Sequence, residues 1–302
     1  MASFSSTTPS SSSSSSSAAI SSSVSSALAL DNIEHLNIND IQALLVATVG
    51  VIEGTDTDDC NYDSIIQLWS KHCKLTDKHL KISNDGEWYS NAYNYWESEA
   101  NCPLNDDGVL GGYGKLTPLD TRDSLKFFDI LKSKYPDIKF DKAADCGAGI
   151  GRVTKSLLLQ LYQHVELIEQ SPRLLQAAPA YIEVDSNRIT LNNIGLQDFN
   201  PEPNSFDCIW IQWVIGHLHD LDFIKFFRNC SKGLRPGGII ILKDNCAENW
   251  TFVVDKQDSS VARCKEYVRL LFHLAGLNII EELKQNDFPT ELYPVIMFAL
   301  RP

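Results

Sequence analysis

The sequence lacks the features of several protein classes. Its 26 Lys and Arg residues are outnumbered by 39 Asp and Glu residues, which gives a net charge of −13. Such a chain repels nucleic acid and anionic lipid and attracts basic partners. The eight cysteines form no Cys-x-x-Cys pair, and no secretory signal is apparent. We therefore expect reduced thiols in a cytoplasmic or nuclear protein, with no metal site and no nucleic-acid or membrane partner.

Long apolar runs and early basic residues are also missing. The longest apolar run near the start, IQALLVATVGVI, is too short to cross a bilayer. No Lys or Arg precedes Lys71, whereas an organelle transit peptide is rich in arginine. The serine-rich stretch at 1–30 cannot bury enough apolar surface to offset its ordering entropy, so we predict that it is disordered.

The rest of the chain divides into an extension and one larger domain. With 302 residues, 43% of them hydrophobic, the chain can form one sizeable core. Residues 31–84 contain two helix-like patterns, IQALLVATV and SIIQLWSKHCKL, separated by the acidic EGTDTDDCNYD. They predict a helical N-terminal extension whose role cannot be inferred from the sequence. Residues 85–302 form the main domain.

Strand-like and helix-like segments alternate from about Asp141 onward. The expected strands are KAADCGAG, HVELIEQ, RITLNNIGLQDF, FDCIWIQWVI and GIIILKDN, with ELYPVIMFALR as a last, antiparallel strand. Helical periodicity marks RVTKSLLLQLY, PRLLQAAPAYI and LDFIKFFRNCSKGL, the last ending at the helix stop RPGG. This order predicts an α/β fold with a doubly wound, mainly parallel sheet.

A glycine turn, DCGAGIGR, lies between the first strand and its helix. Glycines there let a ligand approach the backbone, and the helix N-terminus offers free amides. Gly147, Gly149 and Gly151 give G-x-G-x-G, whereas a dinucleotide fingerprint is G-x-G-x-x-G. The tighter spacing after an acid is typical of the S-adenosylmethionine loop of class I methyltransferases, and other nucleotide uses stay open on this motif alone.

Polar side chains follow the ends of the next strands. Glu169 ends the second strand about 20 residues past the glycines, where a carboxylate can accept both ribose hydroxyls of an adenosine. Asp198 and the backbone near Leu196 and Gln197 follow the third strand, where adenine would be held. Gln212 and Trp213 end the fourth, at the carboxyl edge where open α/β sheets bind ligands.

A second group of residues falls at the same edge. His217 lies one helical turn beyond Trp213, so we expect both to face one pocket, and Asn245 follows the fifth strand. The segments WYSNAYNYWESEA and DGVLGGYGKLTPLD are aromatic and glycine-rich. Their spacing is compatible with core packing or with a lid over the cofactor cleft.

These strings resemble the alpha N-terminal protein methyltransferases. The resemblance spans about Trp88 to Arg301 and includes YWE, GVLGGYG, DCGAGIGR, GLQDF, IWIQWVIGHL, KDN, DSSV and FALR. It implies a doubly wound, seven-stranded class I methyltransferase (Rossmann-like) sheet with a helical lid at 85–120. It also implies methylation of the α-amino group of proteins that begin X-Pro-Lys or X-Pro-Arg, with S-adenosyl-L-methionine as cofactor.

The resemblance also implies roles for individual residues. The cofactor-binding set is Gly147, Gly149, Arg152, Glu169, Gln170, Ser171, Leu196, Gln197 and Gln212. The substrate-binding set is Trp96, Leu110, Gly111, Leu116, Trp213, Asp255, Ser260 and Tyr293. Asp258, His217 and Asn245 form the catalytic set, in which Asp258 and His217 accept the amine proton and Asn245 holds the first residue of the peptide. Asp244 and Glu248 have no role beyond a solvated loop.

Some points depart from the family pattern or stay open. Glu169 stands where the family has Asp, and residues before 85 lie outside the resemblance. A small-molecule amine or carboxylate methyltransferase and a non-catalytic peptide-binding module use the same fold, although the intact glycines argue against the latter. We expect a monomer acting on the N-terminal tails of basic proteins.

Overall fold

The computed structural model describes most of the chain as one sheet-centred body. The described residues are 37–49, 52–72, 75–76, 81–82, 87–247 and 250–302, so the serine-rich stretch predicted to be disordered lies outside them. A seven-stranded sheet runs in the order β12-β13-β9-β8-β5-β6-β7. The prediction of a doubly wound, seven-stranded α/β fold is therefore confirmed.

The strands from β9 to β7 are parallel, and β13 is antiparallel to both β9 and β12. The predicted antiparallel last strand is thus confirmed, whereas β12 was not predicted. The bounds are β5 Lys142–Cys146, β6 His164–Ile168, β7 Ile189–Asn192, β8 Phe206–Gln212, β9 Leu234–Asn245, β12 Asn278–Lys284 and β13 Val295–Arg301.

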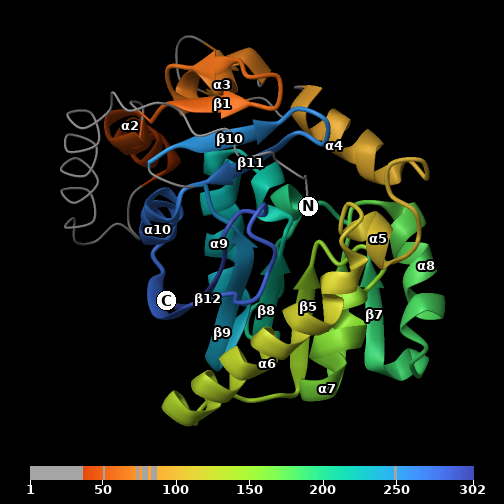
Figure 1. The fold of residues 1–302 in the computed structure, drawn as a ribbon. Helices are drawn as coiled ribbons and strands as arrows, with labels where there is room; N and C mark the ends of the chain where they lie inside the picture. Colours follow the sequence, from red (N-terminus) through yellow and green to blue (C-terminus); the bar gives the residue numbers. More distant parts are fainter. Residues whose placement is uncertain (1–36, 50–51, 73–74, 77–80, 83–86, 248–249) are drawn as a thin grey trace.

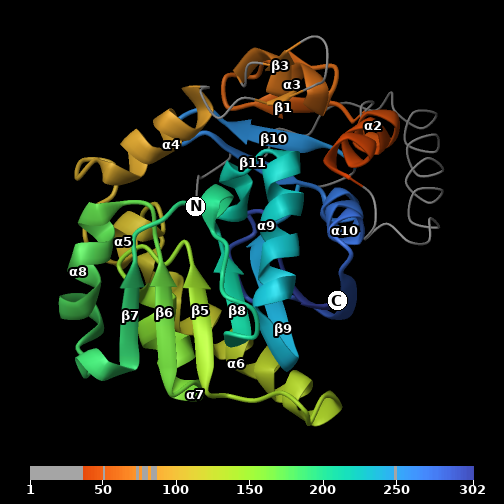
Figure 2. The ribbon, with the colours of Figure 1, turned by 180° about the vertical axis from the view of Figure 1, so that it is seen from behind.

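Helices cover both faces of this sheet. Figure 1 shows α6 in front of the strands, and Figure 2 shows α9 crossing the opposite face. The helix after β5 contains one π-helical stretch, η3, before it continues as α7. The bounds are α6 Thr117–Lys134, η3 Thr154–Leu158, α7 Leu159–Leu161, α8 Pro172–Ile182, α9 Asp220–Gly233 and α10 Lys265–Leu274. Short 3₁₀ turns are η2 Gly114–Leu116, η4 Ser186–Arg188, η5 Leu196–Asp198 and η6 Ile215–His217.

The central strands are buried on both faces, which explains their continuous apolar sequence. Every residue of β8 is buried, as expected for a parallel strand covered by helices on two sides. Trp210 of β8 stacks on Phe128 of α6, with ring centroids 5.6 Å apart. On the other face, Phe223 and Phe227 of α9 pack against Phe272 of α10. These two aromatic groups fix the helices that frame the carboxyl edge of the sheet.

Several predicted strand boundaries were wrong. The predicted strands RITLNNIGLQDF and FDCIWIQWVI extend past the observed ends of β7 and β8, at Asn192 and Gln212. Helix α9 ends at Gly233, as expected from the helix stop, but β9 begins at Leu234, before the predicted strand GIIILKDN. The pairing of β9 with β8 shifts between Phe206 and Cys208, and Gly237 has a φ of 80°. The irregular start accommodates Pro236, which has no N–H to donate to a regular ladder.

The extension is not purely helical. It contains the two expected helices, α2 Ile38–Val49 and α3 Ile65–His72, and also strands β1 Gly54–Asp56, β2 Asn61–Tyr62, β3 Leu75–Thr76 and β4 Lys81–Ile82. Strands β1 and β2 join β10 Phe252–Asp255 and β11 Ser260–Arg263 in a second sheet of order β11-β10-β1-β2. Figure 1 shows this small sheet above the carboxyl ends of the main strands.

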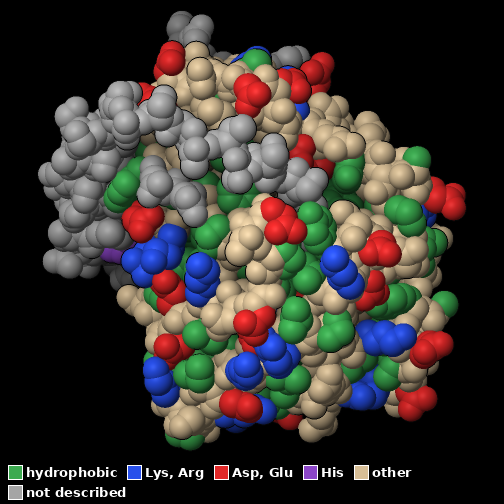
Figure 3. All heavy atoms as spheres, viewed as in Figure 1, with side chains coloured by type: hydrophobic (Ala, Val, Ile, Leu, Met, Phe, Trp, Pro, Cys, Tyr) green, Lys and Arg blue, Asp and Glu red, His purple; other side chains and the backbone are tan. Residues whose placement is uncertain are grey.

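The lid segment consists of α4 Glu87–Glu97 and α5 Asp106–Val109. Both lie beside the carboxyl ends of the main sheet, between the small sheet and α8 (Figure 1). On the face shown in Figure 3, basic and acidic side chains are interspersed over the main domain, without a large patch of one sign. No helix within the described part of the chain has the length and hydropathy required to span a membrane.

Candidate active site

A cavity lies at the carboxyl ends of β5, β6 and β8, under α4 and α5. It encloses about 900 Å³ of empty space, part of it open to solvent. The predicted residues that line it are Trp96, Leu110, Gly147, Gly149, Arg152, Glu169, Gln170, Leu196, Gln197, Gln212, Trp213 and His217. Residues from the lid, the glycine turn and three strand ends therefore meet around one space, which is the ligand edge expected for an open α/β sheet.

The glycine turn forms one wall of the cavity. Gly147, Gly149 and Gly151 have φ values of 74°, 56° and 83°, a region that side chains disfavour. A Cβ at Gly147 would lie 2.5 Å from Val214, and one at Gly151 would lie 2.5 Å from Ile182. A Cβ at Gly149 would lie 3.4 Å from its nearest neighbour, Val109 Cγ1. Gly147 and Gly151 thus allow close packing behind the turn, whereas Gly149 leaves room beside the cavity.

The Glu169 carboxylate accepts backbone hydrogen bonds from the glycine turn and from Ser171. The Gly149 amide donates to its Oε2 at 2.9 Å, and the Ser171 amide donates to its Oε1 at 2.8 Å. Burial raises the pKa of this carboxyl, while the two amide bonds act in the opposite direction. A carboxylate has about four lone-pair positions, so the side chain retains acceptor capacity towards the cavity.

Arg152 belongs to a buried polar network centred on Asp120 of α6. Arg152 Nη1 and Lys243 Nζ lie 2.8 and 2.5 Å from the Asp120 carboxylate oxygens. Burial by itself would raise the pKa of Asp120, but the charges of Arg152 and Lys243 outweigh it and hold the pKa below its usual range. The Gln212 amide also donates to Asp120, at 2.9 Å. This carboxylate connects α6, the glycine turn, β8 and β9.

Gln212 has its side chain fully engaged. Trp210 Nε1 donates to Gln212 Oε1 at 2.9 Å, which orients the amide so that its nitrogen faces Asp120. Gln212 therefore contributes a fixed polar wall to the cavity. Asp120 was not identified from the sequence, although it is the last residue of the lid segment DGVLGGYGKLTPLD.

Trp213 turns out of β8 in a strained conformation. Its φ of 53° lies in the left-handed region that non-glycine residues seldom adopt. The Arg152 guanidinium lies 5.2 Å from the Trp213 ring centroid, within the range of a cation–π contact. The buried indole Nε1 has no hydrogen-bond partner in the described part of the structure. The strained turn presents this aromatic side chain to the cavity.

His217 connects the lid to the acidic hairpin. Its Nε2 lies 3.0 Å from Trp96 Nε1, and its Nδ1 lies 3.0 Å from the Ser259 carbonyl oxygen. An indole N–H is only a donor, so Nε2 accepts and the imidazole proton is on Nδ1, which donates to Ser259. Trp88 Nε1 donates to the His217 carbonyl at 2.8 Å. Both ring nitrogens are therefore engaged.

The turn between β10 and β11 carries the acidic residues. Asp255 is 5% exposed, and Ser260 Oγ donates to Asp258 Oδ1 at 2.7 Å. Burial and the nearby charge of Asp258 raise the pKa of Asp255. Burial together with these two carboxylates raises the pKa of Tyr95 in α4. Among the described residues, no Lys or Arg side chain forms an ion pair with Asp255 or Asp258. This is a site that favours an incoming cation.

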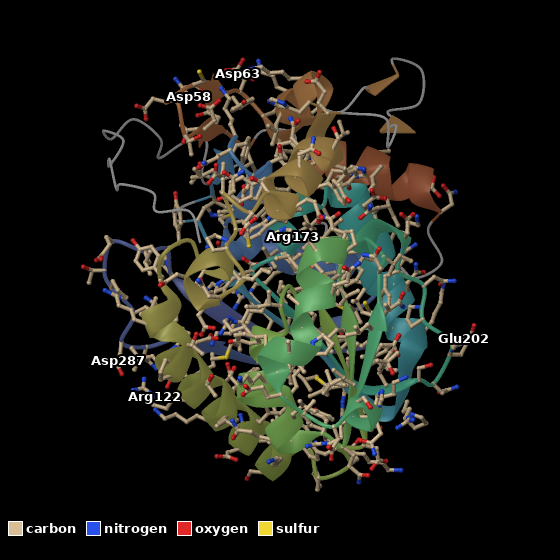
Figure 4. All side chains as sticks on the ribbon, turned by 90° about the vertical axis from the view of Figure 1, so that its right-hand side faces the viewer. Asp58, Asp63, Arg122, Arg173, Glu202 and Asp287 are labelled. Carbon is tan, nitrogen blue, oxygen red and sulfur yellow. The ribbon has the colours of Figure 1, made fainter. Side chains whose placement is uncertain are left out.

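The lid is attached to the main domain by Arg173 of α8. Its guanidinium donates to the backbone oxygens of Trp96 at 2.9 Å, Glu97 at 2.8 Å and Cys102 at 2.8 Å. Figure 4 shows Arg173 near the middle of the molecule, between the extension above and the Arg122–Asp287 pair below. This clamp positions the end of α4, where Trp96 lies. It was not predicted, because nothing in the sequence connects residue 173 to the lid.

Other predicted residues lie outside the cavity lining, including Asp255, Asp258 and Ser260 of the acidic turn, which His217 connects to the cavity. Ser171 instead caps α8 by accepting from the Leu174 amide at 3.1 Å. Leu116 is buried in η2, and Gly111 is exposed with a φ of 57°. Asp198, suggested for the adenine edge, is exposed. Asn245 ends β9, and Tyr293 lies half-buried before β13. Their ligand contacts stay predictions.

Asp244 is not the solvated side chain that was expected. Burial raises the pKa of its carboxyl to about 6, and its Oδ2 has no hydrogen-bond partner among the described residues. Its Oδ1 accepts from the Asn245 amide at 2.7 Å. The expectation of a solvated loop is therefore wrong at Asp244, because β9 extends through Asn245. Glu248 lies outside the described residues.

The cavity fits an S-adenosyl group by its own geometry. The positive-φ glycines leave the backbone bare at Gly149, Glu169 retains acceptor positions for ribose hydroxyls, and Ile194 and Leu196 supply an apolar wall. Arg152 offers a fixed cation for a carboxylate. Together, the sheet order, the turn and this acidic strand end define a class I S-adenosylmethionine-dependent methyltransferase.

The comparisons specify the family. The sequence model of the AdoMet-dependent proline di-methyltransferases matches residues 84–301. The chain belongs to this family, and its cofactor is S-adenosylmethionine.

Related proteins are similar over most of the chain. It is 43% identical over 252 residues to alpha N-terminal protein methyltransferase 1 of Dictyostelium discoideum, covering 82% of this chain and 90% of the relative. It is 43% identical over 222 residues to mouse N-terminal Xaa-Pro-Lys N-methyltransferase 1, covering 73% and 98%. A solved SAM-dependent methyltransferase from Leishmania major has a TM-score of 0.72 and 34% identity, covering 83% of this chain and 96% of that one.

The Asp120 network predicts a coupled loss of stability and cofactor affinity. Asp120→Ala leaves Arg152 and Lys243 buried without their counter-charge, which should lower the free energy of unfolding by about 3–5 kcal/mol. The dissociation constant for S-adenosylmethionine should also rise, because Arg152 loses its anchor. Urea unfolding and calorimetry measure the two effects. Asp129→Ala, an exposed carboxylate on the same helix, is the control. Unchanged stability in Asp120→Ala would contradict this assignment.

Asp145 in β5 predicts a pH dependence of stability. Burial raises the pKa of its carboxyl to about 6, so the folded state keeps a proton that the unfolded chain loses near pH 4. Folding stability therefore falls as pH rises from about 4 to 6. Asp145→Asn keeps an acceptor for Thr154 and removes this ionisation. We expect it to gain about 2 kcal/mol relative to wild type between pH 4.5 and pH 8, measured by urea unfolding. If the free energies of unfolding of wild type and Asp145→Asn change with pH in the same way, this contribution of Asp145 is excluded.

Proposed function

We propose that the protein methylates the α-amino group of protein N-termini that begin X-Pro-Lys or X-Pro-Arg. The observation that carries the proposal is the acidic β10–β11 turn, joined through His217 to the aromatic wall of the cofactor cavity. Relatives that share the domain bear the name N-terminal Xaa-Pro-Lys N-methyltransferase. A turn with two carboxylates beside a methyl-transfer site suits a substrate that carries two positive charges.

Asp255 and Asp258 match the charges of such a peptide. Asp255 is nearly buried, and its raised pKa reflects burial and repulsion by Asp258. An ammonium or guanidinium group at this turn relieves that repulsion and gains from the low local polarity. We assign the third-residue side chain to Asp255 and Ser260, and the α-amine to Asp258. Asn245 then holds the first residue, and Tyr293 the peptide backbone.

The aromatic wall suits the second residue. Proline has no amide N–H, so its surroundings need supply no hydrogen-bond acceptor. The ring of Trp213, held at the end of β8, provides an apolar surface for it, and Leu110 from the lid lines the same cavity. Gly111 and Leu116 support this part of the lid. The specificity for proline thus depends on a fixed aromatic face.

The chemistry requires a neutral amine in line with the methyl donor. S-adenosylmethionine, when bound, supplies an electrophilic methyl group. The unperturbed pKa of an α-amine is about 7.7–8.0, so a weak base suffices and desolvation between aromatic walls lowers that pKa further. Positioning of the amine by Asp258 and Trp96 supplies most of the rate.

Asp258 and His217 have different roles in this proposal. His217 Nε2 accepts a hydrogen bond from Trp96 Nε1, and His217 Nδ1 donates one to the Ser259 carbonyl oxygen. Ser260 donates to Asp258 Oδ1, and Asp258 Oδ2 has no hydrogen bond to any residue that the structure describes. We therefore assign proton acceptance to Asp258 and a positioning role to His217, which holds the lid against the hairpin.

The same proposal includes a monomer that works in the cytosol or nucleus. The described cysteines are all unpaired, and six of them are buried, as is usual for a reducing compartment. The net charge of −13 favours basic protein tails over nucleic acid. Gel filtration and fractionation of cells test these two points.

The substrate assignment predicts methylation of a synthetic peptide beginning Ser-Pro-Lys. Mass spectrometry should show added methyl groups on its α-amine with the wild-type protein. Asp255→Asn should raise KM for this peptide about tenfold, the loss of roughly 1.4 kcal/mol of binding, and should affect a Ser-Pro-Gln peptide much less. Glu202→Gln removes an exposed charge that precedes the amino end of β8, the end away from the cavity, and serves as control; Figure 4 labels this residue.

Two outcomes would contradict this substrate. A protein that binds S-adenosylmethionine but leaves the peptide unmodified would be a binding module or would act on another acceptor. Methylation of small amines without competition from the peptide would favour a small-molecule methyltransferase.

The division of roles predicts different consequences at His217 and Asp258. Glutamine can donate and accept hydrogen bonds but cannot take up the amine proton. His217→Gln should therefore keep turnover within about tenfold of wild type, whereas loss of a general base costs about 10²–10⁴-fold. His217→Ala should be worse than His217→Gln, and Asp258→Asn should lower kcat more than either. Equal large losses in the two His217 variants would instead make His217 the base.

A further inference from the structure

Residues 54–72 precede the 84–301 stretch that the family model matches. They do not line the cofactor cavity either. They nevertheless contact the elements that carry the acidic turn and the lid tryptophans. We propose that this segment, here called the brace, is a positioning element for the peptide side of the active site. The inference rests on the proposed function and adds a part of the chain to that site.

The first contact of the brace is a β-ladder. Strand β1 pairs in parallel with β10, placing Gly54 opposite Phe252 and Asp56 opposite Val254. The Thr57 amide donates to the Val254 carbonyl at 3.0 Å. Strand β10 leads directly into the acidic turn, so its outer edge would expose unpaired backbone groups without β1. The ladder thus fixes the strand that carries Asp255.

The ladder depends on close packing at Gly54. A Cβ at this position would lie 2.4 Å from the ring of Phe252. Phe252 is fully buried and packs against Tyr62 of β2, with ring centroids 6.1 Å apart. Since both rings are enclosed, even one methyl group at Gly54 must displace β1 or Phe252.

The second contact lies at the turn itself. Lys256, next to Asp255, pairs with Asp58 and lies 3.8 Å from the Asp56 carboxylate. Asp56 is 3% exposed and is fixed by the Asp58 and Cys60 amides, each at 3.0 Å. The brace therefore pairs with Lys256, which forms no ion pair with Asp255 or Asp258 in the described part of the structure. This keeps Asp255 and Asp258 available for the charges of a substrate.

The third contact reaches the lid. Trp69 of α3 donates from Nε1 to Asp220 at 2.7 Å, and its ring meets Trp88 of α4 edge-on at 5.2 Å. Asp220 also receives Arg263 of β11 at 3.0 Å. Trp88 in turn donates to the His217 carbonyl. A single side chain of the brace thus connects α4, the end of β11 and the segment that carries His217.

The first two contacts involve the β10–β11 hairpin, the third involves α4 and the His217 segment, and none involves the glycine turn or Glu169. Loosening the brace should therefore weaken peptide binding and leave cofactor binding in place. Gly54→Ala tests the ladder, and Trp69→Phe removes only the indole N–H and part of the ring edge. Cys60→Ser, an exposed position in the same segment, is the matched control.

The experiment compares full-length variants in three measurements. For Gly54→Ala and Trp69→Phe we expect KM for a Ser-Pro-Lys peptide to rise about three- to tenfold, with less than about a twofold change in the S-adenosylmethionine dissociation constant. Hydrogen exchange without peptide should be at least about threefold faster in residues 252–263 and unchanged in 142–146. Cys60→Ser should match wild type in all three.

The outcomes separate the brace from the proposed function. Unchanged peptide KM and unchanged exchange in both variants would overturn the inference, as would equal losses of peptide and cofactor binding. If Gly54→Ala does not fold, Trp69→Phe alone decides by the same criteria. If the wild-type protein fails to methylate the peptide, the proposed function fails, and hydrogen exchange still shows whether the brace holds the hairpin.

Discussion

The arrangement of the site depends on one buried carboxylate. Asp120 forms ion pairs with Arg152 and Lys243 and accepts from Gln212, so one carboxylate connects a helix, the glycine turn and two central strands. Three ionisable groups buried together are costly unless each is paired. Their pairing fixes α6 against the sheet and holds Arg152 and Gln212, which line the cavity. The positions of Arg152 and Trp213 both follow from it, because the guanidinium lies over the indole ring.

The parts of the site that the sequence predicted are local in the chain. Gly147, Gly149 and Gly151 predict a turn because few other residues adopt their positive φ values. Glu169 follows its strand about 20 residues after these glycines, the spacing expected for a ribose-binding acid. The alternation of apolar strand segments with amphipathic helix segments predicted the sheet, because this alternation is also local in the sequence. Each of these patterns spans about 20 residues or fewer, the range over which hydrophobic periodicity and turn-forming residues predict structure.

The parts that were missed depend on partners far apart in the sequence. Asp120 meets Arg152 and Lys243 across 32 and 123 residues, and no motif marks such a pair. Strand β12 was missed because its residues are only half-buried, which weakens the alternation. The strands of the extension are two or three residues long. They form through pairing, β1 with β10 and β2, and β3 with β4. Tertiary context, not local propensity, determines all of these.

The Arg173 clamp has a consequence for how the lid can evolve. The guanidinium donates to four main-chain oxygens, those of Trp96, Glu97, Ser98 and Cys102. The attachment therefore does not depend on which side chains occupy these positions, provided the backbone path is kept. Substitutions at residues 96–102 can alter the shape of the pocket while the lid stays anchored. One arginine outside the pocket thus separates the evolution of acceptor specificity from the integrity of the fold.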